Sequence, residues 1–208
     1  GPNIKDWPEI APLGENLLLK VASYITDPVT TTDELIPSGE TSSYRSNPLG
    51  LAEFTLSRKD PAYVGRAKAV QAEEAARRAG QGDAALLEQI RAVPGCEQLT
   101  WEDVQLSSTI FAVKPGDGSA REQAASCQRV LGAGANIVTE YATKRYRSNL
   151  INWGMLPLQL AGATPFGLGD YVFIPNVREA LKGDLQDIKA YVLGDTVREF
   201  SLYMAPLT

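Results

Sequence analysis

One stretch combines a strand, a glycine-rich turn and a helix, and it constrains the fold more than any other part of the chain. Residues 108–113 are apolar, β-branched and aromatic, which predicts a buried strand. Residues 115–118, Pro-Gly-Asp-Gly, end that strand. Residues 120–131 then predict a helix that Gly132 terminates. A strand that turns sharply into a helix is typical of α/β domains.

The turn before this helix has the composition of an anion site. Ser119 suits the N-cap, and Glu122 three residues later completes a capping box. The glycines leave backbone N–H groups free, and Arg121 adds a cation in the first turn. Because no Lys-Ser/Thr pair of a phosphate loop follows Gly118, we expect a carboxylate. A capped helix whose arginine pairs with a surface acid remains the alternative.

Length and charge limit the possible functions. The 208 residues fit one domain, and the net charge of −5 argues against a general nucleic-acid surface. No apolar run approaches the length of a membrane span, and we see no signal peptide. We therefore expect a cytoplasmic protein.

The absence of histidine excludes any imidazole base, His-containing triad or His metal site within this chain. Its two cysteines, Cys96 and Cys127, are too few for an iron–sulfur cluster or a cysteine-rich zinc site. We expect both to be reduced, structural thiols, although the sequence does not exclude a disulfide. We predict no metal site in this chain.

The remaining patterns predict an α/β domain with a C-terminal β-rich portion. Residues 1–15 are proline-broken and predict a surface strap. Residues 60–93 predict two helices, with Pro61 at the first helical position of one and Asp83 capping the other. For residues 17–25 the periodicity does not decide between strand and helix. Further strands are expected at 135–141 and 170–174, a helix at 143–153, and a hairpin at 187–204.

Two other polar segments are candidate sites. Arg45, in the hydroxyl-rich loop 37–48, suits bidentate binding of a carboxylate, or else the loop is simply solvated. Residues 144–149, Lys-Arg-Tyr-Arg-Ser-Asn, could contact a phosphate backbone, but a solvated helix face is the more economical reading. Asp33 is a possible partner for the loop that carries Arg45.

Several runs, in the same order, resemble the aconitase and isopropylmalate dehydratase superfamily. Residues 118–125, Gly-Ser-Ala-Arg-Glu-Gln-Ala-Ala, resemble the family's Gly-Ser-Ser-Arg-Glu-His-Ala run. Residues 32–36 resemble its Thr-Asp-His-Ile run, and residues 44–47 fall where aconitases carry a substrate-binding arginine. Residues 131–157 resemble its Leu-Gly-Gly, Arg-Ile-His-x-x-Asn-Leu and Gly-x-Leu-Pro segment. The resemblance is strongest to the bacterial aconitase-like hydratases.

The resemblance implies one swivelling β/β/α domain over residues 1–208, with residues 60–93 as a helical insertion. The larger enzyme would be a hydro-lyase that adds water to, or removes it from, a di- or tricarboxylic acid. The other aconitase-like domains, on this or another chain, would hold a [4Fe–4S] cluster, so this chain would contain no cofactor and would be inactive alone. Its partners would be those domains and a small carboxylic acid. We expect no membrane partner, and the acidity of the chain argues against a nucleic-acid partner.

The same resemblance assigns roles to individual residues. Arg45, Ser119 and Arg121 would bind the substrate, with support from Asp33, Asn47, Gly118 and Gln123. The family's serine base maps to Ala120, which has no side-chain oxygen, so Ser119 is the nearest catalytic candidate. The family's histidine maps to Gln123. The alternative is therefore a non-catalytic module that binds a metabolite or RNA and has lost the base.

Overall fold

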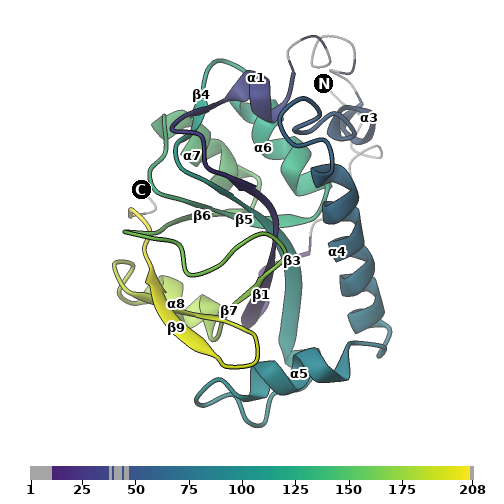
Figure 1. Cartoon of the computed structure of the whole chain (residues 1–208), viewed down its shortest axis with the longest axis vertical. Helices are drawn as coiled ribbons and strands as arrows, with labels where there is room; N and C mark the ends of the chain where they lie inside the picture. The colour runs from purple at the N-terminus through teal and green to yellow at the C-terminus, as the bar shows by residue number, and fades with distance from the viewer. Residues whose placement is uncertain (1–10, 38, 40–43, 45–46, 207–208) are drawn as a thin grey trace.

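The computed structural model describes residues 11–37, 39, 44 and 47–206. They build a seven-stranded mixed sheet in the order β6-β5-β3-β1-β7-β8-β9 (Figure 1). The strands are β1 (Asn16–Ile25), β3 (Val104–Ala112), β5 (Ala133–Val138), β6 (Leu156–Gln159), β7 (Tyr171–Ile174), β8 (Ile188–Val192) and β9 (Arg198–Leu202). Strands β1, β3, β5 and β6 are parallel, whereas β7, β8 and β9 continue the sheet antiparallel. The predicted C-terminal hairpin is therefore confirmed.

The sheet curls until its two edges meet. Gln159 in the edge strand β6 and Tyr203, just after β9, exchange backbone hydrogen bonds of 2.7 and 2.9 Å. The closure encloses an apolar cluster that contains Leu17, Leu19 and Ile137. The neighbouring Leu18 points the other way, into a cluster that also contains Val70. Because both faces of β1 are buried, its sequence is apolar almost throughout, and this is why its periodicity left strand and helix open.

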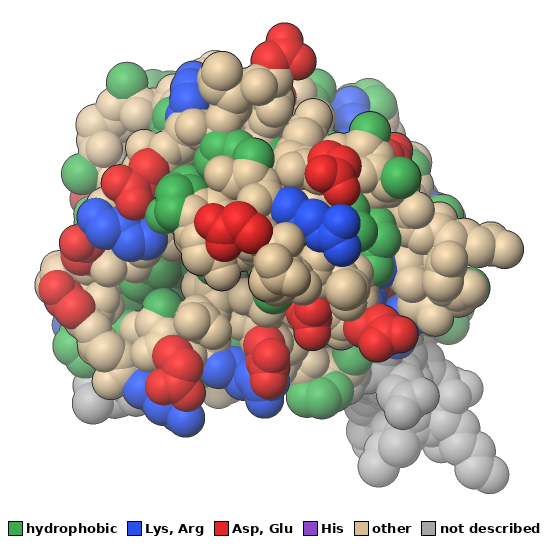
Figure 2. Space-filling view, turned by 90° about the horizontal axis from the view of Figure 1, so that it is seen from below, with side chains coloured by type: hydrophobic (Ala, Val, Ile, Leu, Met, Phe, Trp, Pro, Cys, Tyr) green, Lys and Arg blue, Asp and Glu red, His purple; other side chains and the backbone are tan. Residues whose placement is uncertain are grey.

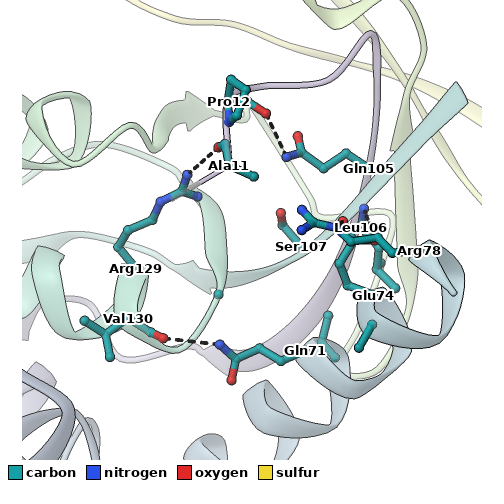
Figure 3. A pocket seen from close by; sticks show the side chains of 13 residues that line it. Ala11, Pro12, Gln71, Glu74, Arg78, Gln105, Leu106, Ser107, Arg129 and Val130 are labelled. Atoms are coloured by element: carbon teal, nitrogen blue, oxygen red, sulfur yellow. Dashed lines mark hydrogen bonds and ion pairs between the residues drawn. The ribbon is translucent and has the colours of Figure 1, made fainter. Parts of the chain in front are cut away.

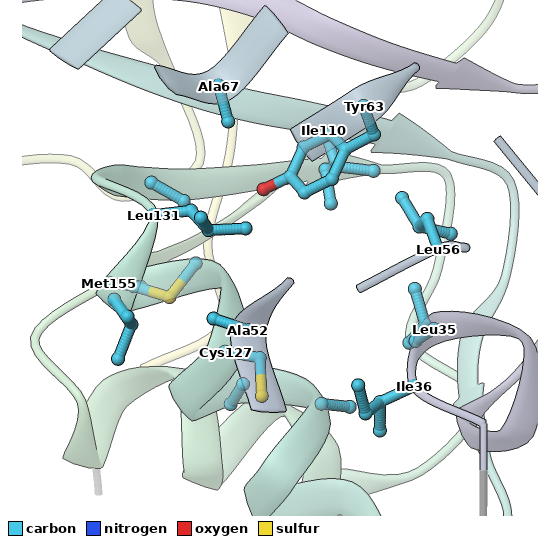
Figure 4. Close-up of a cluster of buried hydrophobic side chains, with 14 of the residues drawn as sticks. Leu35, Ile36, Ala52, Leu56, Tyr63, Ala67, Ile110, Cys127, Leu131 and Met155 are labelled. Carbon is cyan, nitrogen blue, oxygen red and sulfur yellow. The ribbon is translucent and has the colours of Figure 1, made fainter. Parts of the chain in front are cut away.

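Helices cover the outer face of the parallel strands (Figure 1). The apolar cluster beneath them contains Tyr63, Ile110 and Cys127 (Figure 4). Cys127 and Cys96 are both free and buried. The helices are α1 (Thr32–Leu35), α3 (Pro48–Ala52), α4 (Tyr63–Arg78), α5 (Ala84–Arg91), α6 (Arg121–Val130), α7 (Lys144–Asn152) and α8 (Val177–Lys182), with a 3₁₀ turn at Trp101–Asp103.

The two predicted helices are confirmed as α4 and α5, although α5 runs across the end of α4 and does not pack antiparallel along it (Figure 1). Asp83 caps α5 by accepting a hydrogen bond from the Leu86 amide at 3.0 Å. The predicted start of α4 is wrong, because the helix begins at Tyr63 and not at Pro61. The Asp60 carboxylate is bound by Ser23 and Arg66, so residues 60–62 form a turn ahead of the helix.

Of the predicted strap, residues 1–10 lie outside the described part of the chain. Gln105 holds the part that follows: its Nε2 donates to the Pro12 carbonyl at 3.0 Å, and its Oε1 accepts from the Gly14 amide at 2.9 Å. Figure 2, from the end where α5 lies, shows acidic and basic side chains interspersed, so the described residues form no extended basic surface on that face. Across the described residues, no helix is both long and apolar enough to span a membrane.

Candidate functional site

The carboxyl ends of three parallel strands bring Asp33, Ser119 and Arg121 to one end of the sheet. Short connections follow β1, β3 and β5 and lead into α1, α6 and α7. A small parallel ladder joins the first two connections, where β2 (Thr30–Thr31) pairs with β4 (Pro115–Asp117). The Thr30 amide donates to the Lys114 carbonyl at 2.9 Å. The run that contains Asp33 therefore lies beside the glycine-rich turn, at the carboxyl ends of the parallel strands.

The glycine-rich turn is clamped between α1 and α7. Gly116 has a φ of +107°, and a side chain there would come within 2.5 Å of Tyr146 in α7. Gly118 has a φ of +128°, and a side chain there would overlap the Thr32 hydroxyl at the start of α1. Thr143, the N-cap of α7, donates its hydroxyl to the Gly116 carbonyl at 3.2 Å. Both glycines are thus required by backbone conformation and by close approach.

A buried ring of hydrogen bonds supports the turn from below. Gln128 Nε2 donates to the Tyr146 hydroxyl at 2.8 Å, and that hydroxyl donates to Asn136 Oδ1 at 2.7 Å. Asn136 Nδ2 completes the ring with Gln128 Oε1 at 2.7 Å. Burial raises the pKa of Tyr146 well above its ordinary value, so the phenol stays neutral at physiological pH. The ring ties α6, α7 and β5 together beneath the turn.

Arg121 is the first residue of α6, directly after the turn. Its side chain is half-buried, and its Nε is buried without a hydrogen-bond partner among the described residues. A cation is electrostatically disfavoured at a helix N-terminus, and an unsatisfied buried donor costs about 1–3 kcal/mol. The position is thus poor for stability but well suited to binding an anion.

The predicted capping of α6 by Ser119 is wrong. Ala120 occupies the N-cap position without a side-chain hydrogen bond, and Ser119 is exposed. The reason is a contact between distant segments: Gly118 is held against Thr32, and the helix starts only at Arg121. Ala120 is partly buried and packs against the apolar cluster that contains Tyr63 and Cys127, so at this position the chain makes an apolar contact.

The other predicted residues lie in different settings. Arg45 falls outside the described residues. Asn47 caps α3 by accepting from the Gly50 amide at 3.0 Å, a role that its position before Pro48 could have indicated. Asp33 is exposed, 4.0 Å from Arg58. Gln123 is half-buried in α6, and α3 packs against that helix, so Asn47, Gln123 and Arg121 belong to neighbouring elements.

The carboxylates near α1 serve local structure. Lys59 binds Asp27 and lies 3.4 Å from Glu34. The hydrogen bond from Lys59 lowers the pKa of Asp27 below its ordinary value. Glu34 also completes a capping box with Thr31 at the start of α1. These acids behave as turn and cap residues. Sequence reasoning missed Lys59 and Thr32, whose contacts join distant parts of the chain.

The basic run and the two cysteines were also considered as binding groups in the sequence, and the structure places both. In the basic run 144–149, Tyr146 is buried and Arg147 donates to the carbonyls of Ala205 and Pro206, so both residues serve packing. Cys127 lies in the outer apolar cluster, whereas Cys96 lies in the cluster beneath α4 and α5. Within the described ranges, no group of three or more His, Cys, Asp or Glu side chains could hold a metal ion.

These features define an α/β domain with a glycine-rich turn at the carboxyl ends of its parallel strands, and comparisons with known proteins relate it to a family. Residues 80–163 match the model of the aconitase C-terminal domain family, which confirms the predicted relationship over that segment. The matched segment contains the glycine-rich turn and all of α6.

Two other comparisons gave the following results. A similar solved structure is 3-isopropylmalate dehydratase (leuD) from Methanocaldococcus jannaschii, at 17% sequence identity and a TM-score of 0.46, covering 88% of this chain and 83% of that one. No curated protein matched the sequence.

Proposed function

We propose that the 208 residues form one swivel domain that binds substrate carboxylates in a larger aconitase-like hydro-lyase. The observation that carries the proposal is Arg121, a half-buried guanidinium that follows a clamped glycine turn and lacks a partner for its Nε among the described residues. A carboxylate would satisfy this donor, and a bidentate pair with arginine is among the strongest hydrogen-bonded arrangements. The family match over residues 80–163 supports the proposal.

In this proposal the two arginines, Arg121 and Arg45, hold substrate carboxylates. The hydroxyl of Ser119 and the amides of the turn at Gly118 bind another polar atom of the substrate. Asp33, Asn47 and Gln123 support these residues from α1, the N-cap of α3 and α6. Closure of the domain over the remaining enzyme would exclude water and strengthen each of these contacts.

The reaction removes a proton from the carbon beside a carboxylate and expels a hydroxyl group from the neighbouring carbon, or reverses both steps. Ala120 cannot take that proton. The exposed Ser119 hydroxyl is the nearest candidate in this chain, although no described side chain activates it as a base.

The iron–sulfur cluster that the family resemblance implies does not fit the cysteines of this chain. Cys96 and Cys127 are buried in different apolar clusters, and burial raises the pKa of the Cys127 thiol to about 12, which disfavours the thiolate that a metal requires. The proposal therefore places the cluster on the remaining aconitase-like domains and expects this chain alone to be inactive. The two free, buried thiols support a cytoplasmic location.

The test is turnover by the complete enzyme, reconstituted with its cluster domains, on a panel of di- and tricarboxylic acids. We expect Arg121→Ala to lower kcat/KM by about a hundredfold or more, since it removes a bidentate charged contact. The control is Arg178→Gln, which alters an exposed arginine 3.5 Å from Glu15 and is expected to change nothing. Turnover that is indifferent to Arg121 would contradict the proposed carboxylate contact.

A second function is favoured by one residue, Ala120. An apolar N-cap at the position of the family base fits a domain that binds a carboxylate metabolite, or RNA, without catalysis. Replacing it, Ala120→Ser, distinguishes the two readings. A gain of aconitase-like turnover would show a binding site that lacks only its base, whereas an active parent enzyme that Ala120→Ser leaves unchanged would favour a base elsewhere.

A further inference from the structure

A cavity among the described residues lies away from the glycine-rich turn, at the other end of α6. It has a volume of about 510 Å³, within the size range of small-molecule sites. Its walls come from the start of β3, the last turns of α4, the C-terminal end of α6 and the strap at Ala11 and Pro12 (Figure 3). Because α4 forms one wall, the cavity depends on the helical insertion, which lies mostly outside the segment that matches the family model.

The charges around this cavity do not cancel. Glu74 is its only acidic residue among those described, and Arg77 binds both of its carboxylate oxygens, one of them at 3.0 Å. Glu74 also accepts from the Leu106 amide at 3.3 Å. Arg78 lies 3.4 Å from a carboxylate whose charge Arg77 already neutralises. Arg78 therefore contributes an uncompensated positive charge.

Arg129 contributes a second positive charge from the opposite wall. Its guanidinium donates to the carbonyls of Ala133 at 3.0 Å and Ala11 at 3.3 Å, and it pairs with no carboxylate among the described residues. Burial lowers the pKa of Arg129 from its ordinary value, as expected for a cation without an anion. The carbonyl contacts orient the guanidinium without neutralising it.

An uncharged donor completes the lining. Ser107 in β3 is only 8% exposed and lines the cavity, where its hydroxyl can donate to a bound oxyanion. Figure 3 shows this side chain between the two arginine-bearing walls, with the Arg78 guanidinium extending toward it. Without a ligand, each cation has a simple explanation of its own: Arg78 is solvated, and Arg129 is structural. These explanations would not explain why both guanidinium groups and the Ser107 hydroxyl line one cavity whose single described acid, Glu74, is shared between Arg77 and Arg78.

We propose that this cavity binds a small organic anion, with its carboxylate or phosphate group contacted by Arg78, Ser107 and Arg129. Two guanidinium groups and a hydroxyl supply the donors that such an oxyanion requires. Gln71 adds a polar wall, although its Nε2 is occupied by the Val130 carbonyl at 3.2 Å. The site is separate from the proposed carboxylate contact at Arg121 and does not depend on it.

The test is an NMR titration of the backbone amides of the 208-residue chain, with citrate as the carboxylate probe and glycerol 3-phosphate as the phosphate probe. It is run in an Arg121→Gln background, so that binding at the glycine-rich turn does not contribute. We expect at least one probe to saturate with a Kd below about 1 mM and to shift the amides of Ser107 and Gly132. The two probes show which oxyanion the cavity prefers.

The variant is Arg78→Gln, which is expected to keep the fold because Arg77 still holds Glu74. It is expected to weaken binding about tenfold or more, since it removes a charge-assisted contact. The control Arg91→Gln alters an arginine on α5 that pairs with Glu88, and it should leave binding unchanged. The proposal is overturned if neither probe saturates below about 1 mM, or if Arg78→Gln binds as tightly as its background. Citrate binding compared with and without Arg121→Gln reports separately on the proposed function.

Discussion

The two ends of α6 each carry an arginine, and the two arginines have opposite relations to the helix. Arg129 lies in the last turn, where the helix dipole favours a cation, and it donates to two backbone carbonyls. Arg121 lies in the first turn, where the dipole disfavours a cation, and its buried Nε has no partner among the described residues. The first arrangement stabilises the fold, whereas the second lowers stability unless a ligand completes it.

This difference separates two kinds of residue that look alike in the sequence. A residue that satisfies local rules, as Arg129 does, stabilises the fold even without a ligand. A residue that breaks these rules, and whose position requires surroundings that lower the stability of the fold, indicates a function. The surroundings of Arg121 are of that kind, because two glycines with positive φ and a buried hydrogen-bond ring position the helix start.

The largest effect is expected for Gly118→Ala, which attacks the placement of the N-terminal end. The new methyl group would overlap the Thr32 hydroxyl, and the φ of +128° is unfavourable for any side chain. We expect the free energy of unfolding to fall by about 3 kcal/mol, from backbone strain and overpacking together. Urea unfolding checks the value.

Gly162→Ala is the matched control. Gly162 also has a positive φ, +79°, but nothing lies within 4 Å of the position that a side chain would take. Its cost should be the backbone strain alone, about 1 kcal/mol. Equal losses in the two variants would show that the contact with Thr32 does not position the turn.

The next largest effect is expected for the buried hydrogen-bond ring of Gln128, Asn136 and Tyr146. Tyr146→Phe keeps the aromatic ring beside Gly116 but leaves Gln128 and Asn136 each short of a buried partner. We expect a loss of about 2 kcal/mol in the free energy of unfolding. Tyr191→Phe, which removes an exposed hydrogen bond to Glu199, should cost less than about 0.5 kcal/mol. A Tyr146→Phe variant as stable as this control would mean that the ring does not stabilise the fold.

Arg129→Gln tests the C-terminal end directly. It removes a favourable charge from the last turn and two bonds to backbone carbonyls, so we expect a loss of about 1–2 kcal/mol. Chemical denaturation of this variant beside the exposed Arg178→Gln measures the difference. If both variants lose equally little, Arg129 does not anchor the end of α6.

Cys127, in the middle of α6, makes the free energy of unfolding depend on pH. Burial raises the pKa of the Cys127 thiol to about 12, while the unfolded thiol ionises near pH 8.5. The raised pKa stabilises the fold below the unfolded value, and that contribution is lost as pH rises. Between pH 8 and 9.5 we expect a loss of about 1 kcal/mol through this group, which Cys127→Ala removes. Identical pH slopes for the two proteins would mean that the thiol titrates alike in both states.

Local signals predicted much of the fold. The helices α4 and α5, the Asp83 cap and the C-terminal strands each rest on residues close together in sequence. The closure of the sheet between Gln159 and Tyr203 was not predictable, because it joins edge positions far apart in the chain. The cavity at Ser107 was missed for the same reason, since its walls come from four separate segments.

In the candidate site too, features formed by consecutive residues were predictable, and contacts between distant segments were not. The turn and Arg121 were visible as a motif, since their residues are consecutive. The clamp of Gly118 by Thr32 required two distant segments to meet, and it moved the helix start past Ser119. Asn47 was predicted to support the substrate, and it caps α3. Its position before Pro48 predicts an N-cap, whereas the family resemblance concerns Arg45.

The smallest change in stability is expected at the residue on which the proposed function most depends. Arg121→Gln removes a cation from the unfavourable helix end and a buried donor without a described partner, so the free energy of unfolding should change by less than about 0.5 kcal/mol, or rise. Any rise should shrink with added salt, which screens the repulsion between guanidinium and helix dipole. Unfolding at low and high ionic strength, beside Arg129→Gln, measures both. A loss above about 1 kcal/mol would show that Arg121 supports the fold and would remove the contrast between the two ends of α6.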